Sequence, residues 1–156
     1  MRPGALITST GPAQEADVSV RLVERPDVRL QALLLERLKC HAADRGCPYD
    51  GCALEVAAIA GANGTVIGGI TGSLSYDQLY IDLIHIDEYF RGHGFGERLL
   101  RHAEAWAQGK GASHVWLHTY SFQAPAFYLR CGYVKLATIG DAKDPHAMTF
   151  LTKRIG

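Results

Sequence analysis

The stretch YFRGHGFGERLL at residues 89–100 constrains the fold of this chain more than any other. Gly92, Gly94 and Gly96 alternate in it, although each interior glycine costs conformational entropy relative to alanine. The segment QLYIDLIHI (78–86) before them favours a strand, and the apolar spacing after them favours a helix. A turn needs one glycine or two. Three in alternation therefore indicate a backbone that another group must approach closely.

A strand, a glycine-rich turn and a helix together form a common anion site, because free N–H groups point out of the helix N-terminus. Alternating glycines remove side chains that would block a diphosphate, and Arg91 adds a fixed positive charge. A P-loop is excluded because Glu97, not lysine, follows Gly96. A dinucleotide fold is excluded because the next strand, SHVWLHTYSFQ, has no carboxylate to hold a ribose. We predict a diphosphate on another ligand, with a merely flexible turn as the alternative.

Two motifs of the chain resemble those of the GCN5-related N-acetyltransferase (GNAT) family. AFYLRCGY (126–133) resembles the family's A-x-x-x-Y-x-x-x-G-F/Y segment. The family's pyrophosphate motif, R/Q-x-x-G-x-G/A, is matched by Arg91, Gly92, His93, Gly94, Phe95 and Gly96. The resemblance runs from about residue 18 to the end of the chain. It implies an α/β fold, with a mixed, splayed β-sheet flanked by helices, and implies that the glycines cradle the pyrophosphate of acetyl-CoA.

The hydrophobic periodicities predict alternating strands and helices in one domain over residues 17–156, after a flexible tail over 1–16. The predicted strands are 18–24, 54–61, 65–76, 78–86, 113–120, 133–139 and 146–155. The predicted helices are 28–44, a helix from the glycines to Gly109 or Gly111, and 124–132. Because one helix joins strands 78–86 and 113–120, we expect them to be parallel neighbours.

The amino-acid composition limits the classes of molecule that this chain is expected to bind. Lys+Arg and Asp+Glu each number 16, and a balanced charge argues against nucleic acid. No apolar run reaches the roughly 20 residues that span a bilayer, and the first residues do not form a secretory signal, so we expect a cytoplasmic protein with no membrane partner. The cysteines fit no zinc pattern, and we expect free thiols and no bound metal. A metal or redox role is the less favoured alternative for Cys40, Cys47 and Cys52.

Acetyl transfer to an amine requires a neutral amine and a group that accepts its proton. The resemblance implies that the thioester sits where the strand before the glycines splays from its neighbour, against Ile84 and Ile86. Bases of the family lie on that strand, at the positions of Asp82 and Tyr80. Asp82 is the base or a carboxylate that anchors a cationic amine. Strand alternation predicts that Tyr80 and Asp82 share a face with Ile84 and Ile86. The opposite face would then hold Ile81, Leu83 and His85.

Tyr128 matches the family tyrosine that protonates the departing thiolate, with a packed aromatic as the alternative. Ser121 stands where the family often has asparagine, so the resemblance implies a cofactor contact there. A covalent role for Cys131 is disfavoured by its position at a helix end beside a glycine. His85 and His118 are either proton relays or structural histidines.

The loop RGCPYDGC (45–52) corresponds to an acceptor-binding wall in the family. Tyr49 and Asp50 of this loop are expected acceptor contacts. Tyr80 and His118, on two predicted strands near the gap, are the other residues expected to bind the acceptor. The resemblance implies an acetyl-CoA-dependent N-acetyltransferase that acts on a primary amine by direct attack in a ternary complex. The amine belongs to a small molecule or is an exposed protein amine, and a homodimer is a family-based expectation. The alternative is a non-catalytic acyl-CoA-binding or regulatory module with the same fold.

Overall fold

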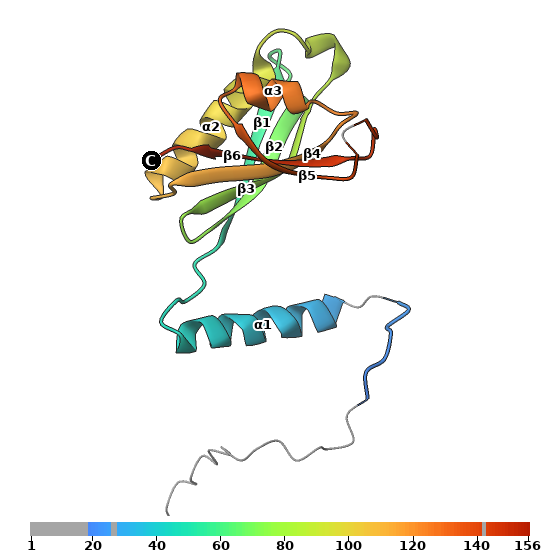
Figure 1. The fold of residues 1–156 in the computed structure, drawn as a ribbon. Helices are drawn as coiled ribbons and strands as arrows, with labels where there is room; N and C mark the ends of the chain where they lie inside the picture. Colours follow the sequence, from blue (N-terminus) through green and yellow to red (C-terminus); the bar gives the residue numbers. More distant parts are fainter. Residues whose placement is uncertain (1–18, 26–27, 142) are drawn as a thin grey trace, which may run out of the picture.

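A computed structural model describes residues 19–25, 28–141 and 143–156 of the chain (Figure 1). It contains a single six-stranded sheet of order β1-β2-β3-β4-β6-β5. The strands are β1 (Cys52–Ala60), β2 (Thr65–Ser75), β3 (Gln78–Ile86), β4 (His114–Tyr120), β5 (Val134–Ile139) and β6 (Met148–Arg154). The helices are α1 (Val28–Asp44), the 3-10 turn η1 (Glu88–Phe90), α2 (Phe95–Gly109) and α3 (Pro125–Arg130).

The core lies between α2 and one face of the sheet. The helix presents Leu99, Leu100, Ala103 and Ala107, all buried, at the spacing of one helical face. Opposite them are the alternate residues of the central strands, which are also buried: Ile70, Leu79, Ile81, Val115, Leu117 and Leu151. This alternation is typical of strands that bury one face. The sheet therefore has one closely packed face, under α2.

The pairing of the strands confirms most of the expected topology. Every neighbouring pair is antiparallel except β3 and β4, which are parallel and joined through α2 as predicted. The predicted first strand over 18–24 is wrong for its described residues, because 19–25 contain no strand. Val20 and Leu22 are 97% and 90% exposed, so the alternating pattern has no neighbouring strand with which to form a ladder. The tail expected over 1–16 lies outside the described residues.

The helix predicted over 28–44 is confirmed as α1, yet it packs differently from α2. None of its residues is buried. It lies beyond the β2–β3 turn, apart from the sheet (Figure 1). Within the described chain, no helix has the length and apolar character needed to cross a membrane.

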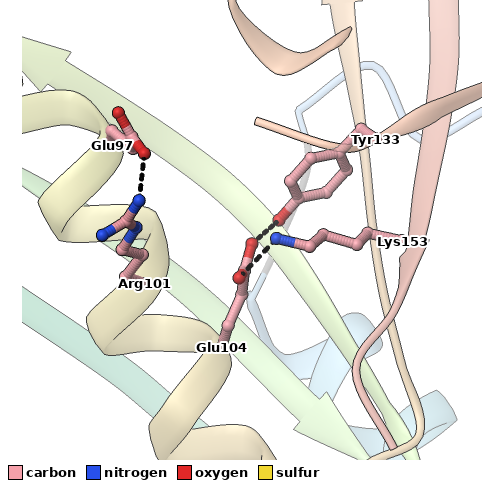
Figure 2. Close-up of polar contacts among 5 residues, drawn as sticks. All are labelled: Glu97, Arg101, Glu104, Tyr133 and Lys153. Atoms are coloured by element: carbon pink, nitrogen blue, oxygen red, sulfur yellow. Dashed lines mark hydrogen bonds and ion pairs between the residues drawn. The ribbon is translucent and has the colours of Figure 1, made fainter. Parts of the chain in front are cut away.

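A charged network ties α2 to the sheet (Figure 2). Glu104 on α2 accepts a hydrogen bond from the Tyr133 hydroxyl at 3.1 Å and pairs with Lys153 of β6, with 2.7 Å between the Lys153 Nζ and the Glu104 Oε2. Both charged groups are partly buried, so their attraction is only weakly screened. The pair Glu97–Arg101 lies nearer the start of the same helix, and both of its side chains are more exposed. The two pairs thus compare a partly buried with an exposed carboxylate on one element.

We expect Glu104→Gln to lower the free energy of unfolding by about 1–3 kcal/mol, because it leaves the Lys153 ammonium without its partner in a poorly hydrated position. Glu97→Gln is the matched control, and its cost should stay below about 0.5 kcal/mol, since exposed helix pairs contribute little. Urea unfolding followed by circular dichroism measures both values. Equal effects of the two variants would contradict the network's role in anchoring α2.

Candidate functional site

The parallel pair β3 and β4 opens partway along its length. Backbone pairing joins Gln78–Ile81 to His114–Leu117 and then stops, although β3 continues to Ile86 and β4 to Tyr120. The splay expected at this place is therefore confirmed. Beyond the last pair, the facing strand edges carry N–H and C=O groups that can bind an extended ligand as a further strand would.

A cleft of about 930 Å³ occupies this opening and extends to the glycine loop and α3. Its walls come from two stretches of the chain, residues 82–97 and 118–131. Ten of the residues expected at the site line it: Asp82, Ile84, Ile86, Arg91, Gly92, Gly94, Phe95, Gly96, His118 and Tyr128. The fold thus brings the predicted loop, strand and tyrosine to one cavity.

A β-bulge at Asp82 interrupts the alternation of β3. Ile81 pairs with Gly72 and Leu83 pairs with Thr71, so Asp82 is an extra residue without a partner on β2. The prediction that Tyr80 and Asp82 share a face with the two following isoleucines is wrong for this reason. Because the bulge shifts the alternation by one residue, Ile84 and Ile86 return to the core side with Leu79 and Ile81, while Tyr80 faces the other side.

The bulge changes what the cleft contains. Asp82 is exposed and lines the cleft, so its carboxylate is accessible to a ligand. Thr71, opposite the bulge on β2, has a buried hydroxyl oxygen without a hydrogen-bond partner. Bulges often redirect side chains beside active sites, and this one follows directly after the last β3–β4 pair.

The glycine loop presents backbone donors to the cleft. Gly92 and Gly94 both have φ of +79°, in the left-handed region that favours glycine, and a Cβ at either would meet no atom within 4 Å. Gly94 is the N-cap residue of α2, and no side chain forms a capping hydrogen bond at this end of the helix. The N–H groups of the first turn are therefore available to an anion. Arg91 donates from Nε to the Ile86 carbonyl at 2.9 Å, which holds its guanidinium at the loop.

Gly96 lies where α3 packs on α2. A Cβ there would lie 3.2 Å from the Phe127 ring of α3, which is tighter than ordinary contact. The absent side chain thus lets α3 pack directly on the first turn of α2. This contact positions Tyr128, the next residue of α3, against the cleft.

Tyr128 is 7% exposed and its ring packs between Phe127 and Tyr133. Burial, and secondarily the neighbouring Cys131, raises the pKa of Tyr128 to about 12, so the phenol keeps its proton at neutral pH. Burial and the carboxylates of Glu97 and Glu104 raise the pKa of the Cys131 thiol. A protonated thiol is a poor nucleophile, which argues against an acyl-enzyme at this cysteine.

The remaining predicted residues divide between the rim of the cleft and places outside it. Tyr80 does not line the cleft, but its hydroxyl lies 3.2 Å from His118 Nδ1, and His118 does line it. Burial, and next the charge of Asp82, raises the pKa of Tyr80. Ser121 donates from Oγ to the Ala147 carbonyl at 3.3 Å, outside the cleft wall. His93 is exposed, and its Nδ1 is 2.9 Å from the Arg91 carbonyl.

Tyr49 and Asp50 lie at the opposite end of β3 from the cleft. Asp50 Oδ1 accepts from the Tyr76 backbone N–H at 3.0 Å, and the Tyr49 hydroxyl is 3.3 Å from Ser75 Oγ. These contacts attach the loop to the β2–β3 turn. The structure therefore separates this predicted acceptor wall from the other site residues.

Several cleft residues were not predicted, and most of them surround α3. They are Phe90, Glu97, Thr119, Phe122, Gln123, Ala124, Phe127 and Arg130. Gln123 organises this wall, because its Oε1 accepts from Thr119 Oγ1 at 3.0 Å and from the Tyr120 backbone N–H at 2.9 Å. The segment SFQAPAFY could have indicated these cleft residues, because residues that flank a predicted catalytic tyrosine on a short helix must lie near the same cavity. Among the described residues, no cluster of three or more His, Cys, Asp or Glu could hold a metal ion.

Comparison with known proteins agrees with this geometry. Residues 36–133 match the Acetyltransferase (GNAT) family. Blasticidin-S acetyltransferase of Streptomyces morookaense is 38% identical over 117 residues, which cover 72% of this chain and 86% of that protein. An acetyltransferase from Bacillus cereus has a crystal structure with a TM-score of 0.69 and 27% identity, covering 86% of this chain and 97% of its own. Nourseothricin acetyltransferase has a TM-score of 0.58 at 26% identity, covering 67% of this chain and 66% of its own.

We expect Gly94→Val to weaken CoA binding by tenfold or more, because the branched side chain would enter the space open to the diphosphate. Gly111→Val is the matched control. Gly111 also has a left-handed φ, +88°, and open space at its Cβ, but it follows the other end of α2. Titration calorimetry with CoA measures both affinities, and circular dichroism checks folding. If both folded variants lost the same affinity for CoA, the loss would come from backbone strain, and this result would contradict a diphosphate site at the loop.

Proposed function

Because this chain belongs to the GNAT family of acetyltransferases, we propose that it transfers the acetyl group of acetyl-CoA to the primary amine of a small molecule. The observation that carries the proposal is the single cleft that joins the glycine loop, the splayed strands and Tyr128. The two substrates bind together, and the amine attacks the thioester directly. The amine nitrogen forms a bond to the carbonyl carbon, the carbon–sulfur bond breaks, and an amide and free CoA result.

The loop and the strand edge would hold acetyl-CoA by different interactions. Backbone N–H groups at the start of α2, with Arg91, would bind the diphosphate, and Arg130 on the opposite wall adds a second positive charge. The pantetheine arm, an extended chain with amide groups, would pair with the free edge of β3 beyond Ile81. Ile84 and Ile86 give the thioester an apolar floor on the core side.

Asp82 would act on the amine. A primary amine has a pKa near 10 in water and is mostly protonated at neutral pH, so attack requires loss of a proton. The accessible carboxylate at the bulge would first attract the ammonium group and then accept its proton, directly or through a water molecule. This gives the anchoring and base roles to one side chain, used in succession.

Tyr128 would act on the sulfur. Its hydroxyl has a pKa raised to about 12 and stays protonated throughout the usual assay range, so it can donate to the thiolate as the carbon–sulfur bond breaks. A thiol has a pKa near 8.5, so complete proton transfer from this phenol is unfavourable in the ground state. We therefore assign it a hydrogen bond that strengthens as negative charge develops on sulfur, with partial proton transfer.

The acceptor would enter from the side of the cleft formed by His118 and Phe122. Relatives of this chain are named for blasticidin S and nourseothricin, which supports a small-molecule amine over a protein amine. His118 contacts Tyr80 and Phe150, so this side offers aromatic faces as well as the Asp82 carboxylate. All four cysteines are free, in keeping with a cytoplasmic enzyme.

We expect the purified protein to release free thiol from acetyl-CoA with at least one amine of a panel that includes nucleoside and aminosugar antibiotics, polyamines, amino acids and a peptide N-terminus. With that amine, Tyr128→Phe should lower kcat about 10²-fold, at the low end for a positioned acid, and change the KM for acetyl-CoA little. Thiol release followed with a chromogenic disulfide measures both constants.

Tyr133→Phe is the matched control, since it removes a phenol hydroxyl from the ring that packs beside Tyr128 but lies outside the cleft wall, and it should leave kcat near the wild-type value. Binding of acetyl-CoA without turnover of any amine would instead favour a non-catalytic module. Full kcat in Tyr128→Phe would leave Tyr128 as a packing residue.

We expect Asp82→Asn to change the acidic limb of the pH profile of kcat/KM. A carboxylate that accepts the amine proton must be ionised, so activity in the wild type should fall at acidic pH. In Asp82→Asn that limb should depend on the free amine alone. Glu88→Gln, which changes an exposed carboxylate of η1 outside the cleft wall, is the control. An unchanged limb in Asp82→Asn would exclude Asp82 as the base.

A further inference from the structure

The helix α1 carries an apolar stripe that its position leaves in solvent. Leu30, Leu33, Leu34 and Leu38 lie on one side at helical spacing, and they are 45–65% exposed. Most of the stability of a helix in a protein comes from the packing of its apolar face. An amphipathic helix of 17 residues with no buried side chain therefore requires a partner surface.

The linker holds α1 away from its own sheet. Cys47 N–H closes the helix on the Ala42 carbonyl at 2.9 Å, and the Cys47 carbonyl accepts from the Tyr76 hydroxyl at 3.3 Å. Tyr49 packs edge-on against Tyr76, with ring centroids 6.3 Å apart, and Lys39 of α1 lies over the Tyr49 ring. With Asp50 also bonded to Tyr76, the linker is attached to the β2–β3 turn, and α1 leaves the body beyond that turn (Figure 1).

The sheet has a matching uncovered face. α2 covers one side, and α3 lies beside α2 through the contact between Gly96 and Phe127. On the other side, the rings of Tyr80 and Trp116 are tilted against each other, with 4.3 Å between their centroids. The His118 ring centroid lies 6.1 Å from that of Tyr80 and 5.9 Å from that of Phe150. These rings are only half-buried, because no helix in the described part of the chain lies over them.

We propose that two copies of this chain exchange α1, so that the leucine stripe of each packs on the aromatic face of the other's sheet. The position of α1 (Figure 1) favours a second copy over the chain's own sheet, since docking on its own sheet would require α1 to turn back at the β2–β3 turn and would break the contact between Lys39 and the Tyr49 ring. Exchange makes both contacts of the pair identical, which closes the dimer with twofold symmetry.

The size of the contact agrees with a stable dimer. At 1.5 Å per residue, α1 is about 25 Å long and about 10 Å wide, so its footprint is about 250 Å². Each of the two contacts buries this area once on the helix and once on the sheet beneath it. The two contacts together therefore bury about 1,000 Å², which reaches the lower bound of specific interfaces. His118 lines the cleft and belongs to the covered face, so the partner's helix would also border the acceptor side; this last consequence rests on the proposed function.

Sedimentation of the full chain should give a dimer, twice the 17.0 kDa of one chain. Leu34→Glu, in the middle of the stripe, should convert it to a monomer with unchanged sheet content by circular dichroism. Ala32→Glu, on the opposite side of α1, is the matched control and should remain a dimer. A monomeric wild type, or a dimer that survives Leu34→Glu, would overturn the proposal.

A cross-link distinguishes exchange from docking within one chain. Two single variants, Leu34→Cys on α1 and Ser73→Cys on the uncovered face, are made with the native cysteines changed to serine, then mixed, refolded together and treated with a bismaleimide. Exchange predicts a product of two chains that requires both variants and is lost with Ala32→Cys in place of Leu34→Cys. A double variant that carries both cysteines on one chain is treated in parallel. A product at the mass of one chain from this double variant, with no product from the mixed single variants, would overturn exchange. Thiol release from acetyl-CoA tests the proposed function separately, because assembly is measured without substrate.

Discussion

The end of pairing between β3 and β4 at Ile81 and Leu117 is the constraint on which the rest of the site depends. Two adjacent strands normally satisfy each other's backbone groups, and burying these groups unpaired is costly. Here the cost is avoided because the facing edges border an open cleft. The same opening is lined by Asp82 and extends to the glycine loop, so under the proposed function it would admit acetyl-CoA between the strands.

The bulge at Asp82 explains why the sequence predicted strand β3 but predicted the wrong orientation for its side chains. The sequence of β3 alternates well enough to predict a strand over 78–86, and that strand is confirmed. A bulge, however, is a property of two strands in register, here Thr71 and Gly72 of β2 against β3. The sequence QLYIDLIHI by itself does not indicate that one of its residues lacks a pairing partner on β2. The face of every later side chain consequently reversed, while the position of Asp82 at the cleft was still predicted.

Patterns with a local cause were predictable, and contacts between distant segments were not. Glycines with a left-handed φ, the helical spacing of α2 and the crossover to a parallel strand follow from steric rules that act within a few residues. The wall formed by Gln123 and Phe127 depends on how α3 packs on Gly96, about 30 residues earlier. Likewise, residues 19–25 have the alternation of a strand, but a strand exists only where another strand offers its edge.

The uncapped start of α2 has a consequence for how the enzyme would use its binding energy. The diphosphate that these N–H groups would hold is remote from the thioester and is the same in acetyl-CoA and in free CoA. Attraction at the loop is therefore equal for substrate, transition state and product, so it lowers KM without raising kcat. Free CoA would leave slowly and compete with acetyl-CoA at the same loop. Turnover would then slow as the ratio of free CoA to acetyl-CoA rises, which would make the enzyme's rate follow the acetylation state of the CoA pool.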